Sequence, residues 1–319
     1  MTSEAQRQAA LARIPQSLEQ IRPGIWAFGQ PLEPPSGLST LSYLLADDRG
    51  GLHVLDPGMP SEQNWARLVA AIESAGHRLG DVRSVIATHL HPDHLGLADR
   101  LREATGAPVV LHRAEQAAID ADSTPRWADG ELRHSWGVPD GTFDELAASV
   151  ARIRLRFTAD LLVDDGDVLD IPGRTLRVIH TPAHTPGSLC LDADGLLFTG
   201  DTVLPDQMAG VGLGGATESN PFRDLRQSMR RLAAFDDHEV LPGHGWRFVG
   251  VAERGAEIVA HHGRRTAEVA GVLQRHPDAS VWQIASQLTW SGGWQNLAGW
   301  RLGSALQQTE QHIALVREG

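Results

Sequence analysis

The stretch Thr88-His89-Leu90-His91-Pro92-Asp93-His94 places four side chains that can bind a metal within six residues. The apolar run just before it predicts a buried strand, and the residues just after it begin a helical pattern. The cluster is therefore predicted to lie on a strand-to-helix loop, where side chains can converge. Imidazole and carboxylate groups are the usual ligands of zinc and similar divalent ions. The alternative, a histidine-rich surface loop without a ligand, is disfavoured by the density of candidate ligands.

Three more candidate ligands follow strand-like runs further along the chain. His184 lies in Thr-Pro-Ala-His-Thr-Pro-Gly, Asp201 ends the run Leu-Leu-Phe-Thr-Gly-Asp, and His244 lies in Pro-Gly-His-Gly. Each stands beside Gly or Pro, where the backbone turns sharply. A single catalytic zinc needs about three protein ligands and a water. The seven candidates together therefore indicate two metal ions that share a bridging ligand.

The order of these motifs resembles the signature of the metallo-β-lactamase superfamily. The chain has His-x-His-x-Asp-His, a later His, a Gly-Asp and a final Gly-His, preceded by an early aspartate in Val-Leu-Asp-Pro-Gly. The resemblance spans residues 56–244. It implies an α/β fold, the αβ/βα four-layer sandwich, in which two mixed sheets pack face to face, helices lie outside, and metals bind at one edge.

The same resemblance assigns roles to the candidate residues. Two divalent ions are implied, most simply Zn²⁺ with Fe or Mn as alternatives, and their ligands would be His89, His91 and His184 for the first ion, Asp93, His94 and His244 for the second, and Asp201 as the bridge. Asp56 would brace the histidine loop from behind the ligands, although an ordinary turn aspartate before Pro-Gly is the simpler interpretation of that residue alone. Asp93 and Asp201 are the candidates for orienting the nucleophile or carrying its proton.

Two metals about 3.5–4 Å apart lower the pKa of a bridging water toward 7 and polarise a carbonyl group. We therefore expect a binuclear metal-dependent hydrolase in which a metal-bridging hydroxide attacks a small-molecule ester, thioester or lactone. Two alternatives stay open: an endoribonuclease or phosphodiesterase of the same fold, and a nonhydrolytic role such as polyketide cyclisation.

The composition limits the kinds of partner that the protein is expected to bind. The net charge is −12, and all 28 basic residues are Arg, so binding to nucleic-acid phosphates is disfavoured. The single cysteine, Cys190, excludes an intrachain disulfide. The sequence has no apolar run of the length that spans a bilayer and no signal-peptide pattern at its start. These features predict a cytoplasmic protein that does not contact membranes.

The chain is expected to divide into a catalytic domain, 1–249, and a C-terminal helical module, 250–319. Residues 113–160 form a helical insertion or cap within the catalytic domain, and residues 1–20 form a lead-in helix or a disordered tail. The C-terminal module resembles the winged-helix-like module of the subgroup typified by lactamase-β-like protein 2. With only two arginines beyond residue 280, it is expected to serve packing, a homodimer contact or the pocket wall rather than DNA binding.

Local signals mark several helices. Apolar spacing predicts a helix over 61–76 with Ser61 as its N-cap, and Asn220 followed by Pro221 predicts another helix start. Within the insertion, one apolar stripe predicts a single helix that includes Phe143, Leu146, Val150, Ile153 and Phe157.

The walls of the substrate pocket are predicted from position along the chain. The insertion and the segment 205–220, with its run Gly-Val-Gly-Leu-Gly-Gly, both leave the sandwich near the metal motifs. The residues expected to line the pocket are Trp127, Trp136, Phe143 and Met208. In the alternative interpretation, the insertion packs against a second subunit or against the helical tail.

Overall fold

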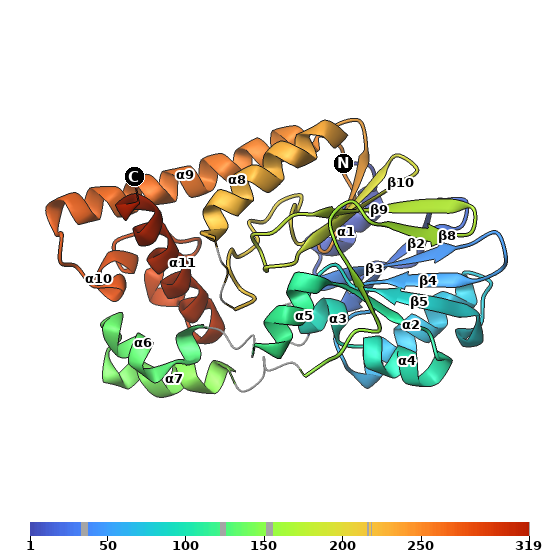
Figure 1. Ribbon diagram of the computed structural model, residues 1–319, viewed down its shortest axis with the longest axis horizontal. Coiled ribbons are helices and arrows are strands. Elements are labelled where there is room, and N and C mark those ends of the chain that lie inside the picture. Colours follow the sequence, from blue (N-terminus) through green and yellow to red (C-terminus); the bar gives the residue numbers. More distant parts are fainter. Residues whose placement is uncertain (33–37, 122–125, 151–155, 216, 218, 319) are drawn as a thin grey trace.

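The computed structural model describes residues 1–319 except 33–37, 122–125, 151–155, 216, 218 and 319. Two β-sheets lie against each other with helices on their outer faces, and a further group of helices lies at the opposite end of the molecule (Figure 1).

The first sheet has seven strands in chain order. They are β1 (Glu19–Arg22), β2 (Ile25–Pro31), β3 (Ser39–Ala46), β4 (Leu52–Leu55), β5 (Val82–Ile86), β6 (Val109–His112) and β7 (Leu161–Val163). The pairs from β1 to β4 are antiparallel and those from β4 to β7 are parallel. The parallel half requires a crossover after each strand, and helices supply most of them.

The second sheet has five strands in the order β12-β11-β10-β9-β8. They are β8 (Val168–Ile171), β9 (Arg174–His180), β10 (Leu189–Ala193), β11 (Leu196–Gly200) and β12 (Glu239–Pro242). Only the β11–β12 pair is parallel, and the others are antiparallel. The parallel pair is joined by a helical crossover that covers the outer face of this sheet.

The helices complete the layers. They are α1 (Glu4–Leu11), α2 (Glu62–Ser74), α3 (Pro92–Leu95), α4 (Ala98–Thr105), α5 (Arg113–Asp120), α6 (Gly130–Ser135), α7 (Asp140–Val150), α8 (Pro221–Leu232), α9 (Val251–Arg275), α10 (Val281–Ala285) and α11 (Gly299–Arg317). Four short 3-10 helices add η1 (Leu79–Asp81), η2 (Arg126–Ala128), η3 (Ala233–Phe235) and η4 (Trp294–Asn296). Within the described residues, no helix has the length and apolar character needed to cross a bilayer.

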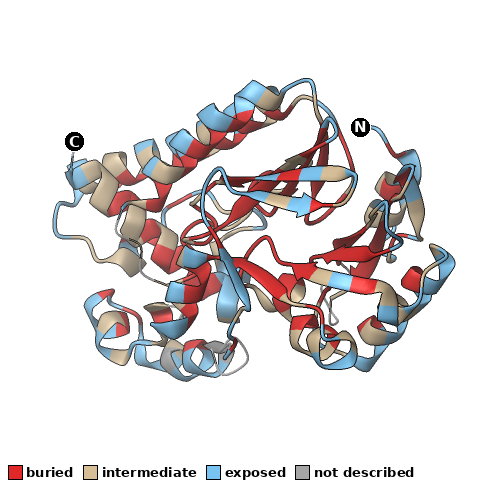
Figure 2. Ribbon diagram, turned by 45° about the vertical axis from the view of Figure 1, so that its right-hand side comes forward, coloured by how far each residue is buried: buried red, intermediate tan, exposed pale blue. Residues whose placement is uncertain are grey.

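Three apolar clusters hold the sandwich together. The cluster between the sheets includes Ile25, Leu41, Phe198 and Leu241. A second cluster joins the outer face of the first sheet to α2 and α4, and a third joins the second sheet to α8 and α9. Figure 2 shows the strands largely buried and the outer faces of the helices exposed. Burial of this apolar area is the main favourable term in folding, and it fixes the sheet edge at which the loops meet.

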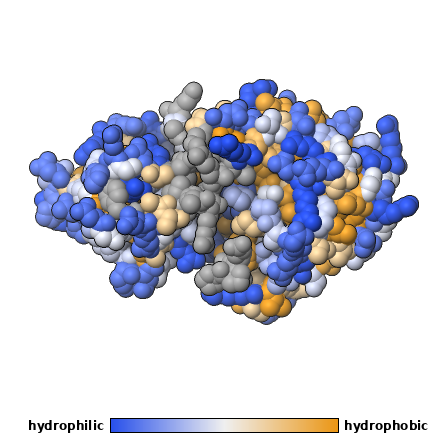
Figure 3. All heavy atoms as spheres, turned by 90° about the horizontal axis from the view of Figure 1, so that it is seen from below, coloured by the Kyte–Doolittle hydropathy of each residue, from blue (hydrophilic) through white to orange (hydrophobic). Residues whose placement is uncertain are grey.

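The remaining helices form what we call the helical part: α6, α7, α10 and α11 with their connections. Its core joins the insertion to the C-terminal helices, because Trp127, Trp136 and Leu146 pack with Leu302 and Leu306. The long helix α9 runs from the sandwich to this part (Figure 1). In the view of Figure 3 the helical part, at the left, is mainly hydrophilic, whereas hydrophobic atoms are more frequent over the sandwich.

The predicted fold class, a two-sheet α/β sandwich followed by C-terminal helices, is confirmed. Both helix starts are also confirmed: the Ser61 hydroxyl accepts the Asn64 N–H at 3.1 Å, and the Asn220 side chain accepts the Phe222 N–H at 3.0 Å. The prediction of a single helix that continues through Phe157 is wrong. Helix α7 ends at Val150, residues 151–155 lie outside the described residues, and Phe157 is not helical but packs with the outer cluster of the first sheet.

Candidate metal centre

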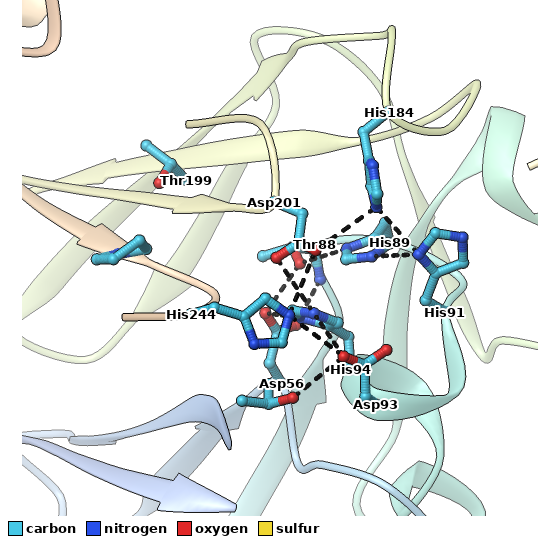
Figure 4. A network of polar contacts seen from close by, with 12 residues as sticks. Asp56, Thr88, His89, His91, Asp93, His94, His184, Thr199, Asp201 and His244 are labelled. Atoms are coloured by element: carbon cyan, nitrogen blue, oxygen red, sulfur yellow. Dashed lines mark hydrogen bonds and ion pairs between the residues drawn. The ribbon is translucent and has the colours of Figure 1, made fainter. Parts of the chain in front are cut away.

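All seven candidate ligands lie at one edge of the sandwich, which we call the metal edge. The histidine motif follows β5, His184 follows β9, Asp201 directly follows β11, and His244 follows β12. Pro92 begins α3, where its fixed φ and missing N–H suit the first helical position. The chain therefore turns into α3 immediately after His91. Figure 4 shows the seven side chains directed toward one another from these four loops.

The first group of ligands consists of three imidazoles. The Nε2 atom of His89 and the Nε2 atom of His184 each lie 3.0 Å from Nδ1 of His91. Their three ring nitrogens thus face a common point, which is the arrangement that a tetrahedral metal with one open position requires.

The second group combines a carboxylate with two imidazoles. Oδ2 of Asp93 lies 3.5 Å from Nε2 of His94 and 3.3 Å from Nε2 of His244. Asp201 stands between the two groups, because its Oδ2 lies 3.6 Å from Nε2 of His184 and 3.4 Å from Nε2 of His244. The carboxylate of Asp201 can therefore reach two ions at once.

The residues fit a pair of divalent metal ions. Nε2 of His94 and Oδ1 of Asp201 are buried and lie 3.4 Å from each other, and neither makes a hydrogen bond among the described residues. Buried polar atoms are almost always satisfied, so two such atoms at the centre of a ligand cluster point to an ion. The donor set of imidazole nitrogens and carboxylate oxygens suits zinc, and also iron or manganese.

The outward nitrogens of several histidines are also held, which orients these ligands and sets their tautomers. Nδ1 of His184 lies 2.7 Å from the Gly210 carbonyl oxygen, and Nδ1 of His244 lies 2.9 Å from that of Ser39. Nδ1 of His89 lies 3.1 Å from the Thr88 hydroxyl. These contacts leave the inward nitrogens free to bind metal.

Asp56 lies behind the histidine loop. Its Oδ1 accepts the Thr88 N–H and its Oδ2 the Thr88 hydroxyl, both at 2.8 Å, and Oδ2 is also 2.8 Å from Nδ1 of His94. Its backbone is in the left-handed region at φ 51°, a conformation that costs energy in residues other than Gly. The geometry is that of a residue that holds His94 in the tautomer with a free Nε2.

The histidines of the two ligand groups have pKa values shifted in opposite directions. Burial lowers the pKa of His89 and His184 and brings the pKa of His91 to about 4, so these rings are neutral and able to bind metal. Burial opposes a charge on His244 too, but the Asp201 carboxylate outweighs it and raises the pKa of His244 to about 10. Burial also opposes a charge on His94, but the neighbouring carboxylates, chiefly Asp93, outweigh it and raise the pKa of His94. The second group therefore attracts positive charge, which a divalent ion would supply in place of protons.

Glu115 belongs to this site although no sequence motif marks it. Its side chain, on α5, is fully buried. Oε2 accepts the Leu90 N–H at 2.6 Å and Oε1 accepts the Gly187 N–H, so one carboxylate connects the loop of His89 and His91 to the loop of His184. Burial raises its pKa to about 7, against hydrogen bonds that lower it. An isolated glutamate on a short helix has no local signal, so only the structure could reveal the contact.

The Gly-rich segment 210–215 lies at the metal edge, as the sequence indicated. The Leu213 N–H donates to the His184 carbonyl oxygen at 2.8 Å, and the Leu213 carbonyl oxygen is 3.5 Å from Nε2 of His91. Gly212 has φ 75°, and a Cβ there would clash with the Gln311 side chain of α11. The positive φ explains the glycine here, because residues with a Cβ rarely adopt this conformation.

Two of the residues expected to line the pocket, Trp127 and Trp136, lie in the helical part. Trp127 and Trp136 are each only 2% exposed in the helical part: Trp127 lies against Gly303, and Trp136 Nε1 donates to Glu310 at 3.1 Å. They join the insertion to α11, in agreement with the alternative interpretation. Met208 is half-buried against the outer cluster of the second sheet and contacts Arg254. The side chain of Phe143 lies outside the described residues.

The motif, the two sheets and the ligand geometry together define a class of protein. The family model of the metallo-beta-lactamase superfamily matches residues 35–244, and the chain belongs to this superfamily. It is a hydrolase with a cluster of His and Asp residues that can bind metal.

Relatives place the chain within this superfamily. It is 29% identical over 252 residues to a protein of Gallus gallus named acyl-coenzyme A thioesterase MBLAC2, a match that covers 73% of this chain and 80% of the relative. It is 29% identical over 134 residues to a beta-lactamase-like protein 2 homolog of Caenorhabditis elegans, covering 41% and 43%. A metallo-beta-lactamase family protein of Thermus thermophilus has a similar structure, with a TM-score of 0.75, 26% identity and coverage of 94% and 95%.

Proposed function

We propose that this hydrolase uses two divalent metal ions to cleave small-molecule thioesters or related esters. The observation that carries the proposal is Asp201, whose carboxylate lies within 3.6 Å of ligand nitrogens from both groups and has one oxygen without a hydrogen-bond partner among the described residues. The relative named as an acyl-coenzyme A thioesterase supports a thioester as the substrate class. Two bound divalent ions supply a nucleophilic hydroxide at neutral pH and stabilise the developing oxyanion.

The residues of the chain have separate roles in this proposal. Asp93 lies between His94 and His244, and its Oδ2 accepts a hydrogen bond from the Thr40 hydroxyl at 3.2 Å. A carboxylate held in this way can orient the nucleophile and accept its proton. Asp201 keeps the two ligand groups in one geometry, and Asp56 fixes the ring of His94.

The negative charge of the protein disfavours RNA as the substrate. The net charge of −12 repels a polyanion, and such repulsion grows at low ionic strength. The test is a hydrolysis screen of acyl thioesters, lactones, phosphodiesters and single-stranded RNA. The enzyme is first reconstituted with Zn²⁺, Mn²⁺ or Fe²⁺. We expect thioesters to be hydrolysed at least about 10²-fold faster than the other classes, and chelation to abolish the activity. Metal-dependent RNA cleavage without thioesterase activity would replace the proposal with the endoribonuclease alternative.

A further inference from the structure

A small cavity lies beside the second group of ligands, on the side of the N-terminal residues. It has a volume of about 60 Å³ and borders His244 together with Ser39, whose carbonyl oxygen is 2.9 Å from Nδ1 of that histidine. It opens between residues 1–16, which we call the N-terminal arm, and the segment that follows Asp201. A group bound there would thus lie next to His244, one of the seven candidate ligands.

One wall of the cavity is apolar and exposed. Leu11 and Ile14 both line it, and their exposed fractions are 55% and 56%. Single exposed apolar residues are common on protein surfaces. Two that converge on a cavity beside a ligand histidine form instead the beginning of an apolar binding surface, because an apolar ligand would remove both from water.

The position of this wall is fixed by hydrogen bonds to the segment that carries His244. Gln16 Nε2 donates to the Gly245 carbonyl oxygen at 2.9 Å. The Thr2 N–H donates to the Arg247 carbonyl oxygen at 3.0 Å, and the Arg247 N–H donates to Gln6 Oε1 at 3.0 Å. The N-terminal arm is therefore attached at both ends to the residues just after His244, and Leu11 and Ile14 are held in place between these attachments.

The charge of the cavity indicates which half of a substrate it accepts. Among the described residues that line it, Asp206 supplies a carboxylate and no arginine is present. An anionic group, such as a phosphate of the thiol carrier or a terminal carboxylate, would be repelled there. The acyl half of a thioester is uncharged and would not be repelled by Asp206.

We propose that this cavity is the acyl subsite of the enzyme and that Leu11 and Ile14 determine its selectivity for a short, uncharged aliphatic group. The proposal rests on the proposed thioesterase function. A cavity needs about 10–15 Å³ per water-sized group, so about 60 Å³ holds about four to six such groups. The matching ligand is a straight or branched acyl group of about four carbon atoms.

The test measures kcat/KM for acetyl, butyryl, hexanoyl and decanoyl thioesters of coenzyme A. We expect a rise of about fourfold per methylene up to butyryl, the increment of a buried methylene, followed by a plateau. The double variant Leu11→Ser/Ile14→Ser should lose most of this rise while keeping its metal content. Leu161→Ser is the matched control, because Leu161 is 49% exposed on β7 and does not border the cavity. A double variant with the wild-type chain-length profile would overturn the assignment.

A second measurement separates this proposal from the proposed function. Alkanethiols from ethanethiol to hexanethiol are titrated into the Co²⁺-substituted protein, and binding is followed by the visible absorption of the metal. We expect affinity to rise with chain length in the wild type and in Leu161→Ser, but not in the double variant. If the wild type hydrolyses no thioester yet shows this pattern, the proposed function fails and the apolar subsite stands. If affinity is independent of chain length in the wild type, the subsite itself is refuted.

Discussion

The metal edge and the helical part are both dense, buried regions, but they are built in opposite ways. At the metal edge, polar side chains from four loops face one another around a common point. In the helical part, Trp127 and Trp136 are enclosed by apolar side chains from α7, α10 and α11. The first region keeps polar groups available for a ligand, whereas the second gains its stability from packing. Changes in the first should therefore alter chemistry, and changes in the second should alter folding.

The largest expected effect is in the metal edge. His184→Ala removes one nitrogen of the first group and the contact with the Gly210 carbonyl oxygen. Activity should fall by about 10³-fold or more, because charge stabilisation by a catalytic metal is worth several kcal/mol. Bound metal, measured by elemental analysis, should drop from about two equivalents to about one, with the circular dichroism spectrum unchanged. A variant that loses its fold rather than its metal would break the distinction between the two regions.

In the helical part the expected effect is on stability. Trp127→Ala empties a buried site against Gly303 and should lower the free energy of unfolding by about 3–5 kcal/mol, the usual cost of such a truncation. Denaturant unfolding measures this loss. The fraction that remains folded should keep its metal and its kcat/KM within about twofold. A selective loss of kcat with normal stability would instead place Trp127 in the substrate site, as the sequence suggested.

The smallest expected effect concerns Glu115, which connects the loops of the metal edge. In Glu115→Gln one amide nitrogen faces a backbone N–H donor from Leu90 or Gly187, so the loops must shift. Such outer contacts of metal ligands are typically worth about 10- to 100-fold in metal affinity. Competition with a chelator should show weaker binding of one ion. Glu310→Gln, which removes the charge that pairs with Arg126 in the helical part, is the control and should leave metal affinity unchanged.

Glu115 also predicts a pH dependence. Burial raises its pKa from 4.5 to about 7, so between these values the folded chain holds a proton that the unfolded chain has released. This contribution to the free energy of unfolding is complete below pH 4.5 and is lost as the pH rises to about 7. The metal-free wild type should therefore lose more stability across this interval than metal-free Glu115→Gln. Parallel curves for the two proteins would contradict the assignment of this titration to Glu115.

The sequence could predict features that depend on neighbouring residues, but not those that depend on tertiary contacts. The ligands His89 to His244 stand in short motifs at strand ends, so local spacing alone pointed to one edge of a sheet, and the fold class followed from the family resemblance. The helix starts at Ser61 and Asn220 were equally local, because a cap depends on its next few residues. Trp127 and Trp136 could not be placed, since an aromatic in an insertion can face a pocket or a neighbouring helix, and only its tertiary partner decides. Glu115, Leu11 and Ile14 act through residues distant in sequence and had no local signature.

The hydrogen bonds of the Gly-rich segment determine which parts of this chain must be transferred together to another scaffold. The Gly212 N–H donates to the Ala183 carbonyl oxygen, and the Gly212 carbonyl oxygen accepts from Gln307 of α11, beyond the matched residues 35–244. A chimaera that grafted only the matched residues onto another scaffold would carry every ligand but would lose the helix that supports the loop of His184. A graft should therefore include α11 together with the ligand motifs.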